Sequence, residues 1–238
     1  MSHYPLLSTD SRFPAVILAD GDYPTHSVPL SVLSSSSCLV CCDGAGAKAI
    51  AHGLSPIAVV GDGDSLPISV RDTLGDRLHI VTEQKFNDLT KATRYVMEQL
   101  GGVSSIAYIA ATGKREDHTL ANISLMAYYE RTFGLSPVMI TDYGYFAVAR
   151  GRNSFGTFPG QQVSIFNISC KRISGEGFRW QPYTYTMFWE GTLNEATGNI
   201  VTIDADGVYM VYRTFDKKKR LRYLRHHPFF RIFAWTTT

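Results

Sequence analysis

The feature that most constrains the fold is a series of short apolar runs that alternate with helical segments through about residue 142. Six runs of four to six residues can be recognised, at residues 15–19, 38–42, 57–60, 78–81, 105–110 and 138–141. Runs that are apolar throughout are typical of strands covered on both faces, and alternation with helices favours a mostly parallel sheet. The N-terminal part is therefore predicted to be a Rossmann-like α/β domain.

Helical periodicity is clearest in residues 88–100, where apolar side chains recur at positions 89, 92, 96 and 100. Asn87 or Asp88 is the expected N-cap of this helix. A second helix is predicted from about Asp117 to Phe133, and two short helices are predicted near residues 29–33 and 44–51. These segments supply the layers that would cover the sheet.

Acidic residues gather where the predicted strands end or a helix starts: Asp20, Asp43, Asp62, Asp64, Asp88 and Asp117. A single acid after a strand also fits an ordinary polar turn. In parallel sheets, however, ligands bind at the carboxyl ends of the strands. Carboxylates held together there repel one another unless a cation lies between them, and Mg²⁺ shared with phosphate oxygens is the usual solution. The acids at four strand ends favour a metal and phosphate site.

The composition and periodicity of the sequence change beyond Arg150, where helical periodicity disappears and turn residues and aromatic residues become frequent. Short alternating runs predict strands at residues 163–168, 183–189, 200–203 and 208–212. This pattern predicts an antiparallel β domain of the sandwich or barrel type. We place the division between a domain of residues 1–148 and a β-sandwich domain of residues 149–238.

The net charge of +2 hides a basic C-terminal segment. From Asp216 to the end the chain has seven basic residues and one acid, so the rest of the chain is mildly acidic. The aromatic residues between Phe229 and Trp235 favour a strand that packs on the body with the charges outside. A nucleic-acid partner is therefore not expected.

The N-terminus and the cysteines indicate a cytoplasmic protein. Residues 1–13 have no apolar core flanked by basic residues, so no signal peptide is predicted, and no stretch is long enough to cross a bilayer. Cys38 and Cys41 have the spacing of a redox or zinc motif, but they lie in an apolar run and no second pair accompanies them. Buried, reduced cysteines are therefore favoured.

Four motifs, in this order, resemble those of the thiamine pyrophosphokinase family. Residues 42–45 (Cys-Asp-Gly-Ala) are similar to its Ala-Asp-Gly-Gly stretch, and residues 61–65 (Gly-Asp-Gly-Asp-Ser) to its Gly-Asp-x-Asp-Ser motif. Residues 87–92 resemble Thr-Asp-x-x-Lys-Ala, and residues 112–122 resemble the long signature Thr-Gly-Gly-Arg-x-Asp-His-x-x-Ala-Asn. The resemblance covers residues 15–142 well and the β domain more loosely.

The resemblance implies an ATP-dependent transfer of a pyrophosphoryl group to the hydroxyl of thiamine, giving thiamine diphosphate and AMP. It also implies Mg²⁺ as cofactor, ATP and thiamine as substrates, and a homodimer in which the β domain completes the active site at the interface. Charge neutralisation and positioning are the main requirements of such a transfer. The acid cluster predicted from the residues fits that chemistry.

The same resemblance implies roles for particular residues. The catalytic set consists of Asp43, Asp62, Asp64, Asp88 and Asp117, of which Asp62, Asp64 and Asp88 are the expected Mg²⁺ ligands. An aspartate near the metal is expected to take the hydroxyl proton, without one being singled out. Contacts to ATP are expected from Gln84, Lys91, Thr112, Gly113 and Arg115. Contacts to thiamine are expected from Trp180, Thr192 and Asn194.

Some of these roles have alternatives in the sequence. Lys91 either reaches a phosphate or pairs with an acid such as Asp88, and Asp117 either caps its helix or holds the nucleotide. Trp180 either stacks on the thiamine ring or belongs to the core of the β domain. Lys114 replaces a glycine of the family signature, and Leu193 replaces a serine that is common before Asn-Glu in the family.

Two other functions fit parts of the pattern. One is pyrophosphoryl transfer to another alcohol, such as a hydroxymethylpterin, in the same fold. The other is a non-catalytic regulator that binds thiamine or a nucleotide. The complete set of acids argues against the regulator, because a degenerate copy usually loses a ligand.

Overall fold

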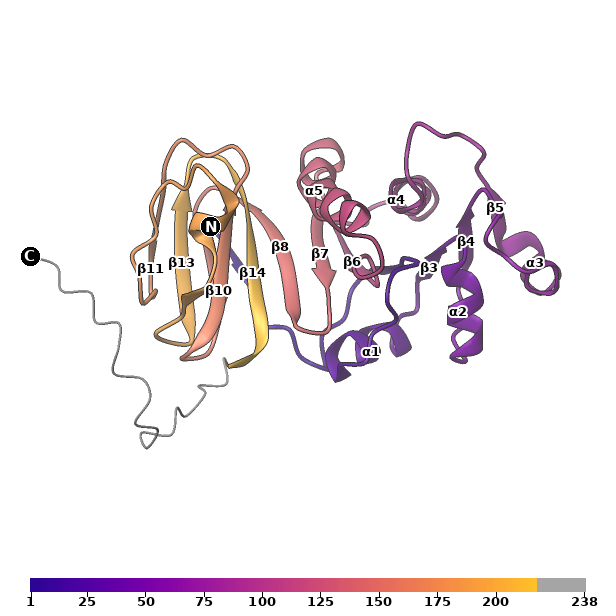
Figure 1. Cartoon of the computed structure of the whole chain (residues 1–238), viewed down its shortest axis with the longest axis horizontal. Coiled ribbons are helices and arrows are strands. Elements are labelled where there is room, and N and C mark those ends of the chain that lie inside the picture. Colours follow the sequence, from indigo (N-terminus) through magenta and orange to yellow (C-terminus); the bar gives the residue numbers. More distant parts are fainter. Residues whose placement is uncertain (218–238) are drawn as a thin grey trace, which may run out of the picture.

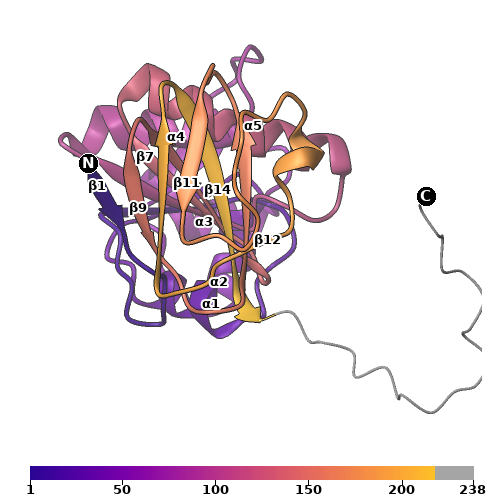
Figure 2. The ribbon, with the colours of Figure 1, turned by 90° about the vertical axis from the view of Figure 1, so that its left-hand side faces the viewer.

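The computed structural model describes residues 1–217, which form two sheets and their covering helices (Figures 1 and 2). The helices are α1 (Ser27–Ser34), α2 (Ala45–Ala51), α3 (Ile68–Leu74), α4 (Asp88–Leu100) and α5 (Glu116–Phe133), with 3₁₀ turns η1 (Gly75–Arg77) and η2 (Phe188–Gly191). The strands are β1 (Ser2–Tyr4), β2 (Ala15–Leu18), β3 (Leu39–Cys42), β4 (Ala58–Gly61), β5 (Leu78–Ile80), β6 (Ser105–Ile109), β7 (Ser136–Ile140), β8 (Gly144–Arg150), β9 (Asn153–Gly156), β10 (Gln161–Asn167), β11 (Ile173–Glu176), β12 (Asn194–Glu195), β13 (Ile200–Ala205) and β14 (Val208–Lys217).

The N-terminal part of the larger sheet is parallel and covered on both faces, as predicted. Its strands follow the order β7-β6-β2-β3-β4-β5. Side chains of a strand alternate between the faces, so Ile17 packs in one cluster with Val96 and Met126, and Val16 and Leu18 pack in another cluster with residues of α1 and α2. Helices α4 and α5 cover one face and α1 and α2 the other (Figure 1).

The larger sheet continues into the C-terminal half of the chain. Strand β8 pairs antiparallel with β7, and β14, β10 and β12 follow it, which makes one sheet of ten strands. A second sheet, in the order β1-β9-β13-β11, packs on β10 and β14, and Phe155, Ile165, Val201 and Val211 belong to the shared core. The predicted β-sandwich is confirmed. The predicted division after residue 148 falls within β8, across which the hydrogen-bonded sheet is continuous.

The N-terminal strand of the chain belongs to the second sheet. Strand β1 runs parallel to β9, and the ring of Tyr4 stacks on that of Phe155 with a centroid distance of 4.9 Å. This pairing joins residues about 150 positions apart, so no local pattern in the sequence predicts it. Helix α3 and strand β9 are likewise absent from the sequence prediction.

The strand predicted over residues 183–189 is wrong. The segment is irregular and leads into the 3₁₀ turn η2, with Met187 and Trp189 exposed. The carboxylate of Glu190 accepts hydrogen bonds from the backbone N–H groups of Thr186 and Met187, which closes a turn where the alternating pattern suggested an extended chain. The predicted strand between Phe229 and Trp235 lies outside the described residues.

Two further expectations can be compared with the structure. Within residues 1–217, no helix is long and apolar enough to cross a membrane. The four cysteines all lie in this part of the chain and are free thiols, and three of them (Cys41, Cys42 and Cys170) are buried. The prediction of unpaired, mostly buried cysteines is therefore confirmed.

Candidate active site

A cavity of about 440 Å³ opens at the carboxyl ends of the parallel strands. Its walls come from the loops after β2, β3, β4 and β6 and from the start of α4. The predicted site residues that line this acid cavity, as we call it, are Asp43, Asp62, Gln84, Asp88, Lys91, Thr112, Gly113 and Arg115. The cavity therefore brings together most of the residues expected to handle metal and ATP.

Asp43 follows β3 and is almost fully buried. Its Oδ2 accepts a hydrogen bond from the backbone N–H of Ser65 at 3.0 Å. Its Oδ1 is buried and has no hydrogen-bond partner among the described residues. A buried carboxylate oxygen without a donor is costly, so this atom fits a site that is completed by a bound cation or donor.

A glycine makes room for Asp43. A Cβ atom at Gly61 would lie 2.6 Å from the Cβ of Asp43, which is closer than two such carbons can approach. Gly61 is the last residue of β4 and the first glycine of the Gly61–Ser65 motif. Its missing side chain allows Asp43 to pack against the end of this strand.

The two acids of that motif separate in the structure. Because β4 ends at Gly61, Asp62 and Asp64 lie in the turn beyond it, where the alternation of a strand no longer applies. Asp62 is half-buried and lines the acid cavity, and its Oδ1 accepts a hydrogen bond from the backbone N–H of Asp64 at 3.2 Å. The side chain of Asp64 is exposed, and Asp64 does not line the cavity.

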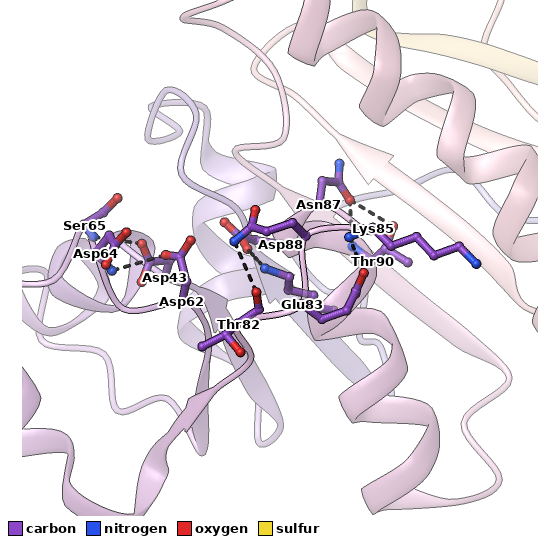
Figure 3. Close-up of polar contacts among 12 residues, drawn as sticks. Asp43, Asp62, Asp64, Ser65, Thr82, Glu83, Lys85, Asn87, Asp88 and Thr90 are labelled. Carbon is purple, nitrogen blue, oxygen red and sulfur yellow. Dashed lines mark hydrogen bonds and ion pairs between the residues drawn. The ribbon is translucent and has the colours of Figure 1, made fainter.

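Asp88 stands in the first turn of α4. Asn87 is the N-cap of this helix, as predicted, and accepts a hydrogen bond from the backbone N–H of Thr90 at 3.0 Å. The buried ammonium group of Lys91 lies 3.2 Å from the Asp88 carboxylate. The acids Asp43, Asp62 and Asp64 and the start of α4 with Asp88 are shown together in Figure 3.

Burial raises the pKa of Asp88, and the negative charges of Asp43 and Asp62 add to this effect. Lys91 opposes it through its hydrogen bond and its charge. Burial is the largest of these effects, and the contributions of Asp43 and Asp62 have the sign expected of like charges in one cavity. A divalent cation would remove this repulsion.

The acids fit a hydrated ion better than a fully dehydrated one. Among the residues that the structure describes, no three Asp, Glu, His or Cys side chains lie close enough to hold a metal by themselves. Mg²⁺ commonly keeps several waters and takes one or two carboxylates together with substrate phosphates. The donors around the acid cavity match this requirement. The assignment of Asp62, Asp64 and Asp88 as ligands stays a prediction.

A second charged cluster contributes Asp20 and Lys114 to the lining of the cavity. The carboxylate of Asp20 lies 2.8 Å from the ammonium of Lys48 and 2.9 Å from that of Lys114. Burial acts to raise the pKa of Asp20, but hydrogen bonds from these two lysines outweigh it, so the pKa is lowered. Lys48 also donates to the carbonyl oxygens of Asp20 and Gly21, which fixes α2 to the end of β2.

The loop that joins β6 to α5 carries the remaining ATP candidates. Gly113 has φ of +83°, and Thr112 and Gly113 both line the acid cavity. The guanidinium of Arg115 binds the carboxylate of Asp117 with two hydrogen bonds, of 3.0 and 2.7 Å. Arg115, through this ion pair, lowers the pKa of Asp117 to about 2.

Asp117 is exposed and does not line the cavity, and Arg115 rather than Asp117 is the N-cap residue of α5. The capping role considered for Asp117 is therefore not borne out, and its role in holding the nucleotide stays a prediction.

Several residues of the cavity were not singled out from the sequence. Asn122 donates to the carbonyl of Ala111 at 2.9 Å and accepts from the side chain of Asn87 at 3.1 Å, so it ties α5 to the start of α4. Phe86 and His118 line the cavity as well. Asn122 lies in the 112–122 signature, which was the available signal, whereas the pairing of Lys48 with Asp20 has no signature in a single sequence.

Unusual backbone conformations concentrate around the cavity. Among the described residues, four that are not glycine have positive φ: Asp43, Ala110, Lys114 and Leu193. The first three line the acid cavity. Such conformations cost free energy and persist where the surrounding structure requires them, so their clustering marks this cavity as a functional site.

The residues predicted to bind thiamine lie elsewhere. Asn194 accepts a hydrogen bond from the backbone N–H of Trp180 and donates to its carbonyl, which brings these two residues together. Trp180 and Thr192 are exposed. Strand β12, which holds Asn194, is seven places from β3 in the sheet order, a distance on the order of 30 Å at the usual strand spacing. No member of this group lines the acid cavity of the same chain.

Comparison with protein families gives two matches that follow one another along the chain. The catalytic domain of thiamin pyrophosphokinase matches residues 30–135, and the substrate-binding domain of thiamin pyrophosphokinase matches residues 144–212. The first match contains Asp43, Asp62 and Asp88, and the second contains Trp180 and Asn194. No curated protein matches the chain.

Solved structures share the fold. The thiamine pyrophosphokinase of Bacillus subtilis is 18% identical, with a TM-score of 0.70 over 87% of this chain and 100% of that chain. The enzyme of Candida albicans is 14% identical, with a TM-score of 0.72 over 90% of this chain and 93% of that chain. The yeast enzyme is 13% identical, with a TM-score of 0.71 over 90% of each chain. With both family domains present in order, the chain belongs to the thiamin pyrophosphokinase family, and the family predicted from the sequence motifs is confirmed.

Proposed function

We propose that the chain transfers the pyrophosphoryl group of ATP to the hydroxyl of thiamine with the help of Mg²⁺, giving thiamine diphosphate and AMP. The observation that carries this proposal is the meeting of Asp43, Asp62 and Asp88 in one cavity that is also lined by Lys91 and Arg115. Acids that repel one another bind the cation, and the two bases bind the phosphates. The two family matches support the same reaction.

Asp62 and Asp88 are the residues best placed to hold the ion, directly or through its waters. Mg²⁺ bound there would neutralise charge on the triphosphate. The free Oδ1 of Asp43 accepts a hydrogen bond from a water of the ion or from the hydroxyl of thiamine. Asp64, which is exposed beside Asp62, is the third acid predicted to hold the ion.

The phosphates of ATP take their contacts from the basic wall of the cavity. Lys91 forms an ion pair with Asp88, one of the proposed metal ligands. Lys114 forms an ion pair with Asp20. Arg115 exchanges its partner Asp117 for phosphate oxygens, since its planar guanidinium fits either anion. Thr112, Gly113 and Gln84 complete the nucleotide site through their polar groups.

The substrate site is completed by a second copy of the chain. Trp180, Thr192 and Asn194 lie on the order of 30 Å from the acids of their own chain, which is too far for thiamine to bridge. In a symmetric dimer the β domain of each subunit can reach the acid cavity of the other, so that two equivalent sites form. The exposed Trp180 ring then stacks on thiamine, a flat cation. A cytoplasmic location forms part of this proposal.

Product analysis tests the reaction. The full chain is incubated with ATP, Mg²⁺ and thiamine, and AMP and thiamine diphosphate are quantified, with equal amounts expected. Asp62→Asn removes a cavity acid and is expected to abolish turnover without unfolding the chain. Asp72→Asn, at an exposed position of α3, is the matched control and keeps full activity.

Two results would redirect the proposal. Formation of AMP with a hydroxymethylpterin but not with thiamine would identify the related pyrophosphokinase. Binding of thiamine or ATP by the unmodified chain without any turnover would identify the non-catalytic regulator.

A further inference from the structure

A second cavity of about 300 Å³ lies at the opposite ends of the parallel strands. Ser105 and Ser136, the first residues of β6 and β7, form part of its wall, whereas the acid cavity lies where the strands end. The N-terminal segment, residues 4–14, covers it from outside. The two cavities share no lining residue.

The wall of this second cavity is mainly apolar, with contributions from Leu7, Phe13, Val138 and Ala147. One residue departs from this character. Arg213 of β14 lines the cavity, so we call it the Arg213 cavity, yet only 1% of the Arg213 surface is exposed. A guanidinium group carries a positive charge at any physiological pH.

The guanidinium is only partly satisfied by the protein. Its Nη1 donates to the carbonyl oxygens of Tyr4 at 3.0 Å and Gly156 at 2.7 Å, and the ring of Tyr145 lies 4.7 Å from its central carbon. Its Nε is buried and has no partner among the described residues. No hydrogen bond from Nη2 to residues 1–217 is found either.

No carboxylate balances the charge of Arg213 within the described part of the chain. Burial lowers the pKa of Arg213, and the groups that oppose this effect are the phenols of Tyr145 and Tyr4 rather than an acid. Glu130, which acts on Tyr4, is already bound to Arg150 by hydrogen bonds of 2.9 and 3.0 Å. A buried cation with neither counter-ion nor full hydrogen bonding is costly to maintain.

We propose that the Arg213 cavity binds a small organic anion, whose acidic group pairs with the guanidinium of Arg213 and whose apolar body contacts Leu7, Phe13 and Val138. The free Nε donor and the charge recognise the acidic group, since charged hydrogen bonds to guanidinium are strong. The apolar wall selects a ligand with a hydrocarbon or aromatic body. The exposed Arg12 at the rim adds a second positive charge on the way in.

This anion site is separate from the reaction described above and does not depend on it. The competing explanation is that Arg213 only fastens β1 to β9 through the carbonyls of Tyr4 and Gly156. A purely structural arginine requires no ligand, so a binding measurement separates the two.

The probes are benzoate and phenyl phosphate, with benzamide as an uncharged molecule of matched shape. Each is titrated into the full chain, and heat release and the change in melting temperature are recorded. Binding of either anion at least about tenfold tighter than benzamide is expected, because the anion makes charge-assisted hydrogen bonds. Equal affinity for benzamide, or no binding of either anion at millimolar concentration, overturns the proposal.

Two variants locate the site. Arg213→Met keeps the bulk but removes the charge, and is expected to weaken benzoate binding at least about tenfold. Ser136→Phe leaves Arg213 intact and fills the cavity, because Ser136 and Val138 lie on the same face of β7 and both line it. This variant is expected to weaken the binding of both benzoate and phenyl phosphate. Arg131→Met, at an exposed position of α5 outside the cavity, is the control and binds as the unmodified chain does.

The variants keep the proposal testable if one of them fails to fold. Arg213→Met also removes two hydrogen bonds that hold β1, so the folding of each variant is checked by its melting temperature. Should Arg213→Met not fold, Ser136→Phe decides by itself, since it alters an exposed residue. Unchanged benzoate affinity in the folded variants overturns the assignment of the site.

Discussion

Lys114 shows how a single side chain combines strain and charge. Its φ of +50° is unfavourable for any residue except glycine, and its ammonium lies 2.9 Å from Asp20 at the wall of the acid cavity. Lys114 also replaces a glycine of the family signature. A residue in a strained conformation next to an ion pair is expected to contact a bound ligand rather than to stabilise the fold.

We therefore expect Lys114→Gly to raise the KM for ATP severalfold with a smaller effect on kcat, because a cation is lost from the phosphate side. The free energy of unfolding should change by less than about 1 kcal/mol, since relief of strain and the added chain entropy of glycine oppose each other. Steady-state kinetics and denaturant unfolding measure the two effects. Lys114→Ala keeps the strain and removes the charge, so an unchanged KM in both variants would show that the charge has no role.

Gly61 provides the complementary case, in which a missing side chain is required. The Cβ of Gly61→Ala would lie 2.6 Å from the Cβ of Asp43, so the acid or strand β4 must move. We expect a loss of about 1–3 kcal/mol in the free energy of unfolding, and a fall in kcat because Asp43 is displaced. Gly198→Ala is the control, since its added Cβ meets nothing within 4 Å. Equal stability and activity of the two variants would contradict the packing argument.

The sequence predicted eight of the residues that line the acid cavity but few of their contacts. The motifs pointed to Asp43, Asp62 and Asp88, which the structure brings into one cavity because each follows or begins a regular element that directs its side chain. Asp62 and Asp64 were both expected at the metal, but β4 ends at Gly61, three residues before Asp64, so a turn and not the strand directs these two side chains. The pairing of Lys48 with Asp20 depends on how α2 lies against β2, which no local pattern encodes.

Among the elements, α1 shows how the end of a distant strand fixes a helix. Asp142, two residues beyond β7, accepts hydrogen bonds from the backbone N–H groups of Thr25 and His26, at 2.9 and 3.0 Å, and from the hydroxyl of Thr25 at 2.6 Å. Burial acts to raise the pKa of Asp142, but these hydrogen bonds outweigh it and lower the pKa. The carboxylate thereby anchors the loop that enters α1.

Asp142→Asn is expected to lower the free energy of unfolding by about 1 kcal/mol at neutral pH, a figure reduced by the exposure of the group to solvent. A carboxyl group whose pKa is lowered by folding stabilises the protein above its unfolded pKa, and this contribution is lost as the pH falls through the folded value. The difference between variant and unmodified chain should therefore begin to shrink as the pH falls below about 4 and disappear only below the lowered pKa of the folded state. A difference that persists at low pH would contradict this account.

Elements with a strong local signal were predicted well, and elements held by distant partners were not. Helix α4 has the predicted bounds because its apolar positions and its N-cap are both encoded locally. Strands β1 and β9 are short, and their pairing partners, β9 for β1 and β1 and β13 for β9, lie far along the chain or are short themselves, so neither strand stands out in the sequence. The segment of residues 183–189 alternates like a strand, but the hydrogen bonds of Glu190 close it into a turn.

For the whole molecule, the separation of the acids from Trp180 predicts shared active sites. An Asp62→Asn chain and a Trp180→Ala chain are each expected to be inactive as homodimers. Mixing them under conditions that exchange subunits should restore about a quarter of the original rate, since half of the dimers are mixed and each contains one intact site. Absence of any recovery, with subunit exchange verified by mass, would mean that each chain forms its site alone.

The pairing of β1 with β9 has a consequence for how the chain is made. Strand β1 is synthesised about 150 residues before its partner β9, so it stays unpaired while the whole parallel sheet is synthesised. At about 5–20 residues per second this delay is on the order of 10 s. The sandwich is therefore completed late, by a strand made before the parallel sheet, and a change that hinders β1 would interfere with the last stage of folding rather than the first.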